Sequence, residues 1–342
     1  MLSPGRNRKS AAPDFRLIFS VLAVLLAIAS ASCGNRNAKA GEKSGNPAKE
    51  NAAQRTFASP DAAGNALFEA AKADDKNALL AIFGPQSKDL LSSGDAVKDK
   101  NTLQAFVNAY REMHRWSKNK AGGEILYIGA DNFPFPLPLD QNASGQWSFN
   151  TAAGKDEILA RRIGDGELTT IGVLSEIATA EQAYFRQNHQ FTQKFVSDQG
   201  EHDGLYWPVA EGQRPSPLGP LGETAKLLGY TASEKREPFE GYYYKILTQQ
   251  GEKAKGGAED YLHNGRLTGG FAVVAWPAKY QDSGIMTFLV GEDGVIYQKD
   301  LGEKTAELAT NMADYNPGDG WSVVLAPEPI STRTGVVSAR KE

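Results

Sequence analysis

One stretch in the middle of the chain constrains the fold more than any other: residues 155–191, KDEILARRIGDGELTTIGVLSEIATAEQAYFRQNHQF. Apolar side chains recur in it at intervals of three and four, the spacing that a helix lays along one face. These side chains are Leu168, Ile171, Leu174, Ile177, Ala178, Tyr184 and Phe185. A long helix with so wide an apolar face predicts a wall shared by whatever folds before it and after it.

The start of the chain has the composition of a targeting segment. It opens with four basic residues, Arg6, Arg8, Lys9 and Arg16. An apolar run over 17–29 follows, too short to span a bilayer comfortably, and then come small residues and Cys33, the single cysteine. A cysteine in this setting resembles the lipobox of bacterial lipoproteins, which implies cleavage before Cys33 and its acylation. The alternative is ordinary signal-peptidase cleavage after Ala31, which would leave a free thiol near the mature terminus.

The next segment, 34–55, contains no aromatic and no branched apolar residue. Such a segment cannot bury enough apolar surface to offset the entropy lost on ordering, so a disordered tether is predicted. The expected organisation is a signal segment at 1–33, a tether at 34–56, an N-terminal α+β layer at 57–153, the long helix with a sheet domain at 154–325, and a flexible tail at 326–342.

The N-terminal layer is expected to be helical first and then to form strands. Apolar spacing predicts helices at 62–73, 76–83, 87–91 and 101–116, and strands at 124–128 and 146–150. Between the strands, the run NFPFPLPL at 132–139 has proline at every second position and should be extended. Phe133, Phe135 and Leu137 are expected to face the core; the alternative is a polyproline segment that binds a partner.

The second half should contain an antiparallel sheet. A long loop rich in glycine and proline is expected over 190–236, with one helical turn at 224–228. Four strands are predicted after it, at 241–249, 270–276, 285–290 and 295–299, and the last two are joined by the hairpin signal Gly-Glu-Asp-Gly. Four successive strands form a meander, and the long helix is the obvious cover for its apolar face. The predicted fold class is therefore α+β.

The order of helix, long loop and meander resembles the globular domain of type IV pilins and pseudopilins. The matching residues are Ala180-Glu181, Tyr184, Gly241-Tyr242, Ala275-Trp276-Pro277, Ser283-Gly284, Thr287-Phe288 and Gly294-Val295-Ile296-Tyr297. In pilins an apolar helix runs directly into this domain, whereas here the apolar segment lies far upstream. The resemblance therefore implies a pilin-like fold and does not extend to filament assembly.

A second resemblance covers nearly the whole mature chain. It rests on Ser59-Pro60, Trp147-Ser148-Phe149, Gly154-Lys155-Asp156-Glu157-Ile158 and Gly320-Trp321. With the signal segment, these residues resemble a family of bacterial exported proteins known as domain of unknown function 2950. The resemblance implies an exported, envelope-associated protein and supplies no activity.

Candidates for chemistry are few. A net charge of -4 argues against nucleic acid, which requires a concentrated basic face. The four histidines have no metal-binding spacing, no Gly-x-Ser-x-Gly elbow is present, and neither a metal nor a cofactor is predicted. The candidate polar site is Glu181 with His202 and Asp203 of the long loop. Glu181 lies on the apolar side of the helix, where it could act as a general acid with a raised pKa or accept hydrogen bonds from loop amides.

The function predicted from these features is that of a non-enzymatic envelope protein. It would reach the periplasm or outer membrane, attach to the membrane through a lipid on Cys33, and use its pilin-like domain to bind other envelope proteins. The expected interface residues are Trp207, Tyr242, Tyr243, Tyr244 and Trp276, because aromatic residues dominate interface energetics. The alternative is a periplasmic hydrolase or small-ligand-binding protein with a cleft between the two layers, where Glu181 and His202 converge.

Overall fold

The computed structural model describes residues 54–209, 212–231 and 237–324. The expected signal segment with Cys33, most of the expected tether and the expected tail lie outside the described residues. The described part is a mixed α+β fold, as predicted, with a long helix, helices around it and antiparallel sheets.

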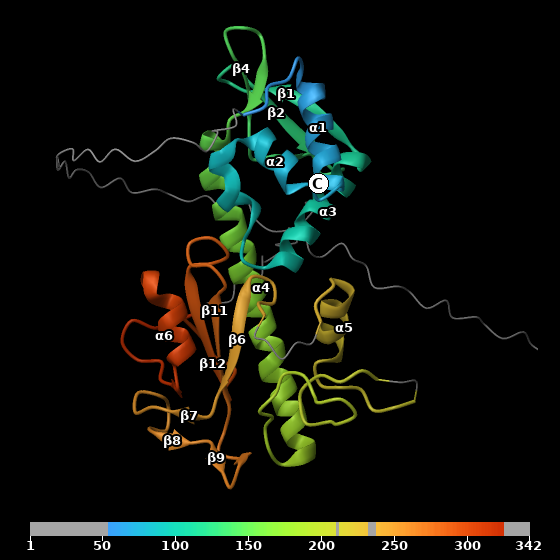
Figure 1. Cartoon of the computed structure of the whole chain (residues 1–342). Coiled ribbons are helices and arrows are strands. Elements are labelled where there is room, and N and C mark those ends of the chain that lie inside the picture. The colour runs from blue at the N-terminus through green and yellow to red at the C-terminus, as the bar shows by residue number, and fades with distance from the viewer. Residues whose placement is uncertain (1–53, 210–211, 232–236, 325–342) are drawn as a thin grey trace, which may run out of the picture. The chain divides into compact units, whose positions relative to one another are not determined.

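The long helix α4 spans Thr151–Asn188 (Figure 1). It begins and ends slightly earlier than the predicted 155–191. At its start the side chain of Asn150 accepts a hydrogen bond from the backbone N–H of Ala153, which caps the first turn. The helix ends because His189 adopts a left-handed conformation with φ 55°, which turns the chain out of the helix.

The buried face of α4 differs from the predicted face at one position. Leu174 is fully buried, but Leu168 is 50% exposed, so the expectation that Leu168 faces the core was wrong. Six residues turn a helix by about 600°, so Leu168 points about 120° away from Leu174. The face that packs inward is formed by Gly166, Thr170, Val173, Leu174, Ile177, Ala178, Ala180, Glu181 and Tyr184.

The N-terminal layer packs helices against a small sheet. Its helices are α1 (Pro60–Lys72), α2 (Lys76–Phe83), the 3-10 helix η2 (Pro85–Leu91) and α3 (Ala96–Glu112). Its strands are β1 (His114–Lys118), β2 (Glu124–Ile128), β3 (Phe133–Pro134), β4 (Leu139–Gln141) and β5 (Trp147–Phe149). They run in the order β1-β2-β4-β5, with β3 also paired to β2. The two predicted strands are present as β2 and β5, and they belong to a sheet of five strands.

The described chain enters this layer through several hydrogen bonds. The side-chain amide of Gln54 donates to the carbonyls of Ile82 (2.9 Å) and Phe149 (2.7 Å). Phe57 and Trp147 exchange backbone hydrogen bonds of 2.8 Å in both directions. Phe57 thereby joins a core that includes Leu79 and the other buried side chains of α1, α2 and β5. The first described residues are therefore fixed to the layer through α2 and β5.

The helix predicted at 101–116 is shorter at its C-terminal end than expected. It ends at Glu112, and Met113 is extended with φ -162° and ψ 138°. His114–Lys118 forms β1 instead, with Trp116 paired to Leu126 across the antiparallel ladder. The apolar spacing alone predicted a helix over these residues. The five residues of β1 instead pair with β2, and this pairing stabilises the strand.

The proline-rich run is extended, as predicted, but not all of its apolar residues face the core. Leu137 is buried and Phe135 packs at the edge of the core. Phe133 is 50% exposed, and the guanidinium of Arg161 lies 4.6 Å from its ring centroid. The expectation for Phe133 was wrong because a cation from α4 covers the ring in place of apolar neighbours.

The second half is built on a five-stranded antiparallel sheet. The four predicted strands are present as β6 (Tyr242–Leu247), β11 (Ala272–Pro277), β12 (Met286–Gly291) and β13 (Ile296–Asp300). A fifth, β15 (Ser322–Val323), joins at the edge, so the order is β15-β13-β12-β11-β6. Smaller pairings add β7 (Gln249–Gln250), β8 (Glu259–Asp260) and β14 (Asp314–Tyr315) in one group and β9 (Leu262–His263) with β10 (Arg266–Leu267) in another.

The two faces of this sheet are covered by different helices (Figure 1). Tyr244 of β6 points towards α4, and its hydroxyl lies 3.3 Å from Thr170 Oγ1. The next residue, Lys245, points the opposite way and donates to the carbonyls of Thr310 (2.9 Å) and Met312 (2.7 Å) at the end of α6 (Thr305–Asn311). The short 3-10 helix η3 (Gly302–Lys304) leads into α6.

Two glycines of α4 mark where the helix is touched most closely. A Cβ atom on Gly154 would lie 2.3 Å from the carbonyl oxygen of Pro136, and one on Gly166 would lie 2.4 Å from that of Ser283. Glycine in a helix interior costs roughly 0.5–1 kcal/mol relative to alanine. The close approach of the N-terminal layer at Gly154 and of the sheet at Gly166 explains why it is present.

The long loop contains more structure than predicted. Its helix α5 spans Gly219–Leu227 rather than the expected turn at 224–228. The loop is pinned at its start by Phe191, whose ring lies 4.5 Å from that of Phe185 and 4.9 Å from that of Phe271. Trp207 and Leu218 are buried further along and join the same core.

The contacts of α4 with the N-terminal layer are mainly polar. The hydroxyl of Thr151 donates to the carbonyl of Phe83 (2.7 Å), and the guanidinium of Arg162 donates to the carbonyl of Leu90. The same guanidinium also pairs with Asp282, which belongs to the second half. Leu174 packs in the core of the sheet and not between the two layers, so the expected shared wall is divided along the helix. Ile158 is the apolar residue of α4 that packs against the core of the N-terminal layer.

Candidate functional site

Glu181 is the most deeply buried carboxylate of the candidate polar site. Its side chain is 0% exposed, and its Oε2 accepts a hydrogen bond of 2.9 Å from the backbone N–H of Thr192, in the long loop. Burial raises the pKa of Glu181 to about 7, against the lowering effect of its hydrogen bonds from Thr192. Among the described residues no cation forms a salt bridge with Glu181. The carboxyl group therefore fastens the loop to the helix.

The hydrogen-bond count at this position favours a protonated carboxyl group. The hydroxyl oxygen of Thr192 lies 3.0 Å from Glu181 Oε1 and 2.9 Å from the carbonyl oxygen of Lys194. One hydroxyl hydrogen cannot serve two acceptors fully. If Glu181 is protonated on Oε1, it donates to Thr192, and Thr192 donates onward to Lys194. With an ionised Glu181, one of the two acceptors loses its donor.

His202 and Asp203 lie at the same end of α4 as Glu181, but their side chains contact other residues. The imidazole of His202 stacks on Trp207 at 4.5 Å, and the carbonyl of His202 accepts from the hydroxyl of Tyr184 (3.1 Å). The carboxylate of Asp203 pairs with Lys194, and this hydrogen bond lowers the pKa of Asp203. The structure thus brings the three candidates to one end of α4 without joining them in a cavity.

The aromatic residues expected at an interface are mostly inside the protein. Tyr242 and Trp276 are buried in the core of the sheet, and Trp207 is buried in the loop. Tyr243 is half-buried against Trp276, with ring centroids 5.6 Å apart, and Tyr244 is bonded to α4. Tyr242, Trp207 and Trp276 therefore pack within this chain and are not available to contact a partner in this structure.

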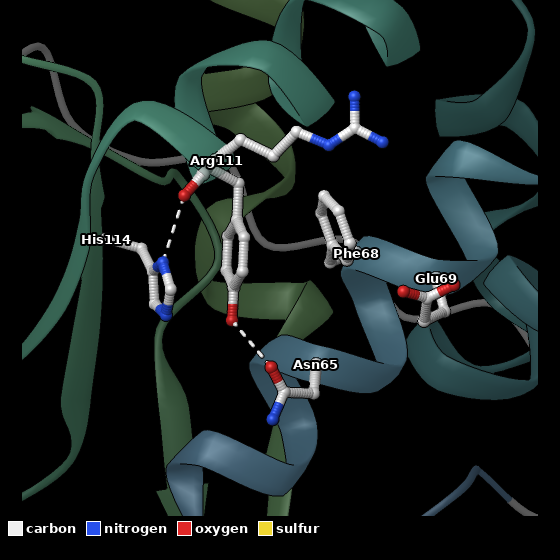
Figure 2. Close-up of a pocket in the computed structure, with 6 residues that line it drawn as sticks. Asn65, Phe68, Glu69, Arg111 and His114 are labelled. Carbon is white, nitrogen blue, oxygen red and sulfur yellow. Dashed lines mark hydrogen bonds between the residues drawn. The ribbon is translucent and has the colours of Figure 1, made fainter.

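An open depression of the surface that the sequence did not reveal lies between α1 and the end of α3. It has a volume of about 310 Å³ and is lined by Asn65, Phe68, Glu69, Tyr110, Arg111 and His114 (Figure 2). This volume is at the lower end of the range of about 300–1,000 Å³ that is typical of ligand pockets. We refer to these six residues as the α1–α3 pocket.

The apolar wall of the α1–α3 pocket is a row of three rings. Tyr110 lies between Phe68, at 5.1 Å and 23°, and His114, at 3.9 Å and 8° (Figure 2). The row is fixed by hydrogen bonds at both sides: His114 Nδ1 lies 2.9 Å from the carbonyl of Tyr110, and the Tyr110 hydroxyl donates to Asn65 Oδ1 at 3.4 Å. Burial, and to a lesser extent Asp61, raises the pKa of Tyr110 to about 12, so its hydroxyl remains a donor.

The charges around the pocket do not cancel. The ammonium of Lys72 lies 5.7 Å from the Phe68 ring centroid and pairs with Glu69 at 3.3 Å. The guanidinium of Arg111 lies 5.4 Å from the same centroid, and no carboxylate of the described residues lies within salt-bridge distance of it. Arg111, which is exposed, therefore places a guanidinium without an ion-pair partner in the described part of the chain beside an aromatic surface.

Sequence reasoning missed this pocket because its residues come from two separate helices. The predicted helix continued to Trp116, whereas the chain becomes extended at Met113, and beyond it the His114 ring stacks on Tyr110. The one local signal was the spacing of Tyr110 and His114, four residues apart at the end of a helix. Nothing local pointed to Asn65 or Phe68.

Metal-binding clusters and membrane-spanning helices are considered for the described residues only. Within residues 54–209, 212–231 and 237–324, no cluster of histidine, cysteine, aspartate and glutamate has the geometry to hold a metal ion. In the same part of the chain, every helix is too short or too polar to cross a membrane.

Comparison with known proteins identifies a family but no individual relative. Neither the curated proteins nor the solved structures contain a match to the chain, so the resemblance of the second half to pilins gains no support and stays a prediction. A family model described as a protein of unknown function, DUF2950, matches residues 54–324, which is nearly all of the chain after the expected tether. The chain belongs to the DUF2950 family.

Proposed function

We propose that the protein is a non-enzymatic binding protein of the bacterial cell envelope. In this proposal it is exported, held at a membrane by a lipid on Cys33, and binds its partner through the α1–α3 pocket. Other envelope proteins are the class of partner expected, and a small ligand is the alternative.

Export is supported by the order of features at the start of the chain. A basic start, an apolar run over 17–29 and a cysteine after small residues are typical of a lipoprotein signal. An unpaired cysteine exposed in an oxidising compartment is a liability, and acylation would remove the thiol.

Binding at the α1–α3 pocket is supported by one observation, the position of the Arg111 guanidinium over an aromatic ring without an ion pair in the described part of the chain. Its guanidinium lies over Phe68 without an ion-pair partner among the described residues. Arginine beside an aromatic surface is enriched where proteins bind partners, because the planar cation offers directed hydrogen bonds and stacking together.

A hydrolytic function has weaker support. Its central residue would be Glu181, which is enclosed and bonded to Thr192 rather than facing a cavity. Glu69, the carboxylate of the α1–α3 pocket, is paired with Lys72. Neither carboxyl group is positioned opposite a second catalytic side chain.

The export and anchoring proposal is tested by metabolic labelling in a bacterial host. The protein should incorporate radioactive palmitate, and Cys33→Ala should abolish the label. Ser32→Ala, which keeps the cysteine, serves as the control and should be labelled normally. A mature N-terminus at an unmodified Ser32 in the wild-type protein would refute the lipid anchor.

A further inference from the structure

We infer that the α1–α3 pocket binds a single carboxylate carried on an apolar, preferably aromatic, body. The inference rests on the proposed binding function and names the chemical class of ligand. Its ligand could be the C-terminal residue of a peptide or a free organic acid, since both present the same group.

The polar side of the pocket offers donors. Arg111 presents a guanidinium with no carboxylate partner in the described part of the chain. Asn65 accepts from Tyr110 at Oδ1, and no acceptor among the described residues pairs with its amide nitrogen. His114 donates its Nδ1–H to the carbonyl of Tyr110, so Nε2 of the neutral ring is an acceptor and the ring contributes stacking rather than a donor. A carboxylate can accept from a guanidinium and a neighbouring amide together.

The charge balance selects the type of anion. Glu69 lines the same pocket with its charge offset by Lys72 at 3.3 Å, and Asp61 acts electrostatically on Tyr110, whereas Arg111 has no ion-pair partner among the described residues. A singly charged anion can pair with Arg111 and is repelled less by these two carboxylates than a doubly charged one. A phosphate monoester, with close to two charges near neutral pH, would bring its second charge near Glu69. The pocket should therefore prefer a carboxylate to a phosphate.

The apolar side of the pocket selects the body of the ligand. Phe68, Tyr110 and His114 form one stacked row beside these donors. A planar or branched apolar group next to the carboxylate would pack on this row, and aromatic pairs gain roughly 0.5–1.5 kcal/mol beyond their buried area. The volume of about 310 Å³ suits one such side chain rather than an extended chain.

The experiment is calorimetric titration of the full chain in mild detergent. N-acetylphenylalanine should bind, whereas N-acetylphenylalaninamide, which lacks the charge, should bind at least tenfold more weakly. Inorganic phosphate should also bind at least tenfold more weakly. Raising the salt concentration should weaken binding of the acid, because the attraction is partly exposed to solvent.

Two variants assign the binding to the pocket. Arg111→Met should reduce affinity at least tenfold. The matched control is Arg115→Met, which removes one cation from a cation–π pair outside the pocket, over Tyr127 at 4.3 Å, and should change affinity less than twofold. Asn65→Asp keeps an acceptor for Tyr110 but adds a negative charge, so it should abolish binding while the circular dichroism spectrum stays unchanged.

The source of the carboxylate is separated by a peptide. A tetrapeptide ending in free phenylalanine that binds more tightly than N-acetylphenylalanine would identify a peptide C-terminus, and equal affinity would identify a free acid. Both results support the inference. Equal binding of the acid and its amide, or unchanged affinity in Arg111→Met, would overturn the ligand class and leave the proposed binding function intact. Absence of binding for every probe would overturn the inference, while the palmitate experiment still decides anchoring.

Discussion

The two halves of α4 are held in place by different forces. Over 151–165 the helix is exposed or half-buried apart from Gly154, and it is attached by hydrogen bonds from Thr151 and Arg161 to backbone carbonyls. Over 166–188 it buries nine residues against the sheet and the long loop. The same continuous helix is thus a polar brace in one layer and an apolar wall in the other.

This difference shows where stability and position are determined. Burial of apolar side chains gives the second half of the helix a large, non-directional stabilisation. Hydrogen bonds to carbonyls at fixed sites contribute less free energy but define the position of the first half. The comparison predicts that equal-sized changes in the two halves should have unequal effects.

The largest effect should come from Leu174→Ala in the second half. Leu174 is fully buried in the core of the sheet, and such truncations cost roughly 2–5 kcal/mol in the free energy of unfolding. Hydrogen exchange should show loss of protection in β11 and β12 and retained protection in β2. Equal loss in β2 would show that the two layers share one core after all.

The next effect concerns pH and Glu181. Its pKa is raised to about 7 in the folded protein from an ordinary value of 4.5, because burial disfavours the charged form. The folded state therefore holds the proton more tightly than the unfolded state. The resulting stability is fully present below about pH 4.5 and is lost as pH rises through about 7, and it amounts to at most about 3.5 kcal/mol at roughly 1.4 kcal/mol per unit.

Glu181→Gln tests this assignment by chemical denaturation at several pH values. A glutamine amide can donate to Thr192 Oγ1 and accept from Thr192 N–H, as the protonated acid does. The variant should have a flatter pH dependence and exceed the wild type in stability at pH 8. Glu176→Gln, at an exposed position on the same helix, is the control and should keep the wild-type profile. A variant less stable than the wild type at pH 8 would contradict the assignment.

A smaller effect is expected at the polar brace. Arg162→Met removes the guanidinium from the carbonyl of Leu90 and from Asp282, whose side chain is 7% exposed. Lys279 remains beside Asp282 at 2.8 Å, so we expect a loss of about 1–3 kcal/mol in urea denaturation. Glu157→Gln, on the same helix, weakens only the more exposed pair of Glu157 with Arg161 and should cost under about 1 kcal/mol. An equal loss in the free energy of unfolding for both variants would show that the half-buried contacts of Arg162 stabilise the helix no more than an exposed ion pair does.

The smallest effect is expected at Leu168, between the two halves. The side chain is 50% exposed, so Leu168→Ala should change the free energy of unfolding by no more than about 0.5 kcal/mol. Thermal unfolding beside Leu174→Ala would measure the contrast on one helix. A large loss of stability in Leu168→Ala would mean that the Leu168 side chain is buried in solution.

The sequence predicted the elements with strong periodicity and missed those that depend on distant partners. The run GFAVVAW was identified as a strand, and the helix through Leu174 was identified within a few residues at each end. β1 was missed because the pairing of Trp116 with Leu126, ten residues further along the chain, is not visible in the local sequence. Leu168 was wrongly placed in the core because intervals of three and four residues also connect positions that border the buried face of a helix.

The candidate polar site shows the same limit. The spacing places Glu181 on the buried side of α4, but its partner Thr192 is set by the left-handed turn at His189. The α1–α3 pocket depends on packing between Phe68 and Tyr110, which are separated by a second helix and η2. No pattern in one sequence shows that contact.

The attachment of Gln54 and Phe57 has a mechanical consequence. If the chain is held at Cys33 as proposed, tension along it would reach the described residues at the bonds from Gln54 to Ile82 and Phe149. The load therefore enters the layer that contains the α1–α3 pocket. A partner gripping that pocket would balance the tension within the same layer, so the sheet of the second half would carry none of it.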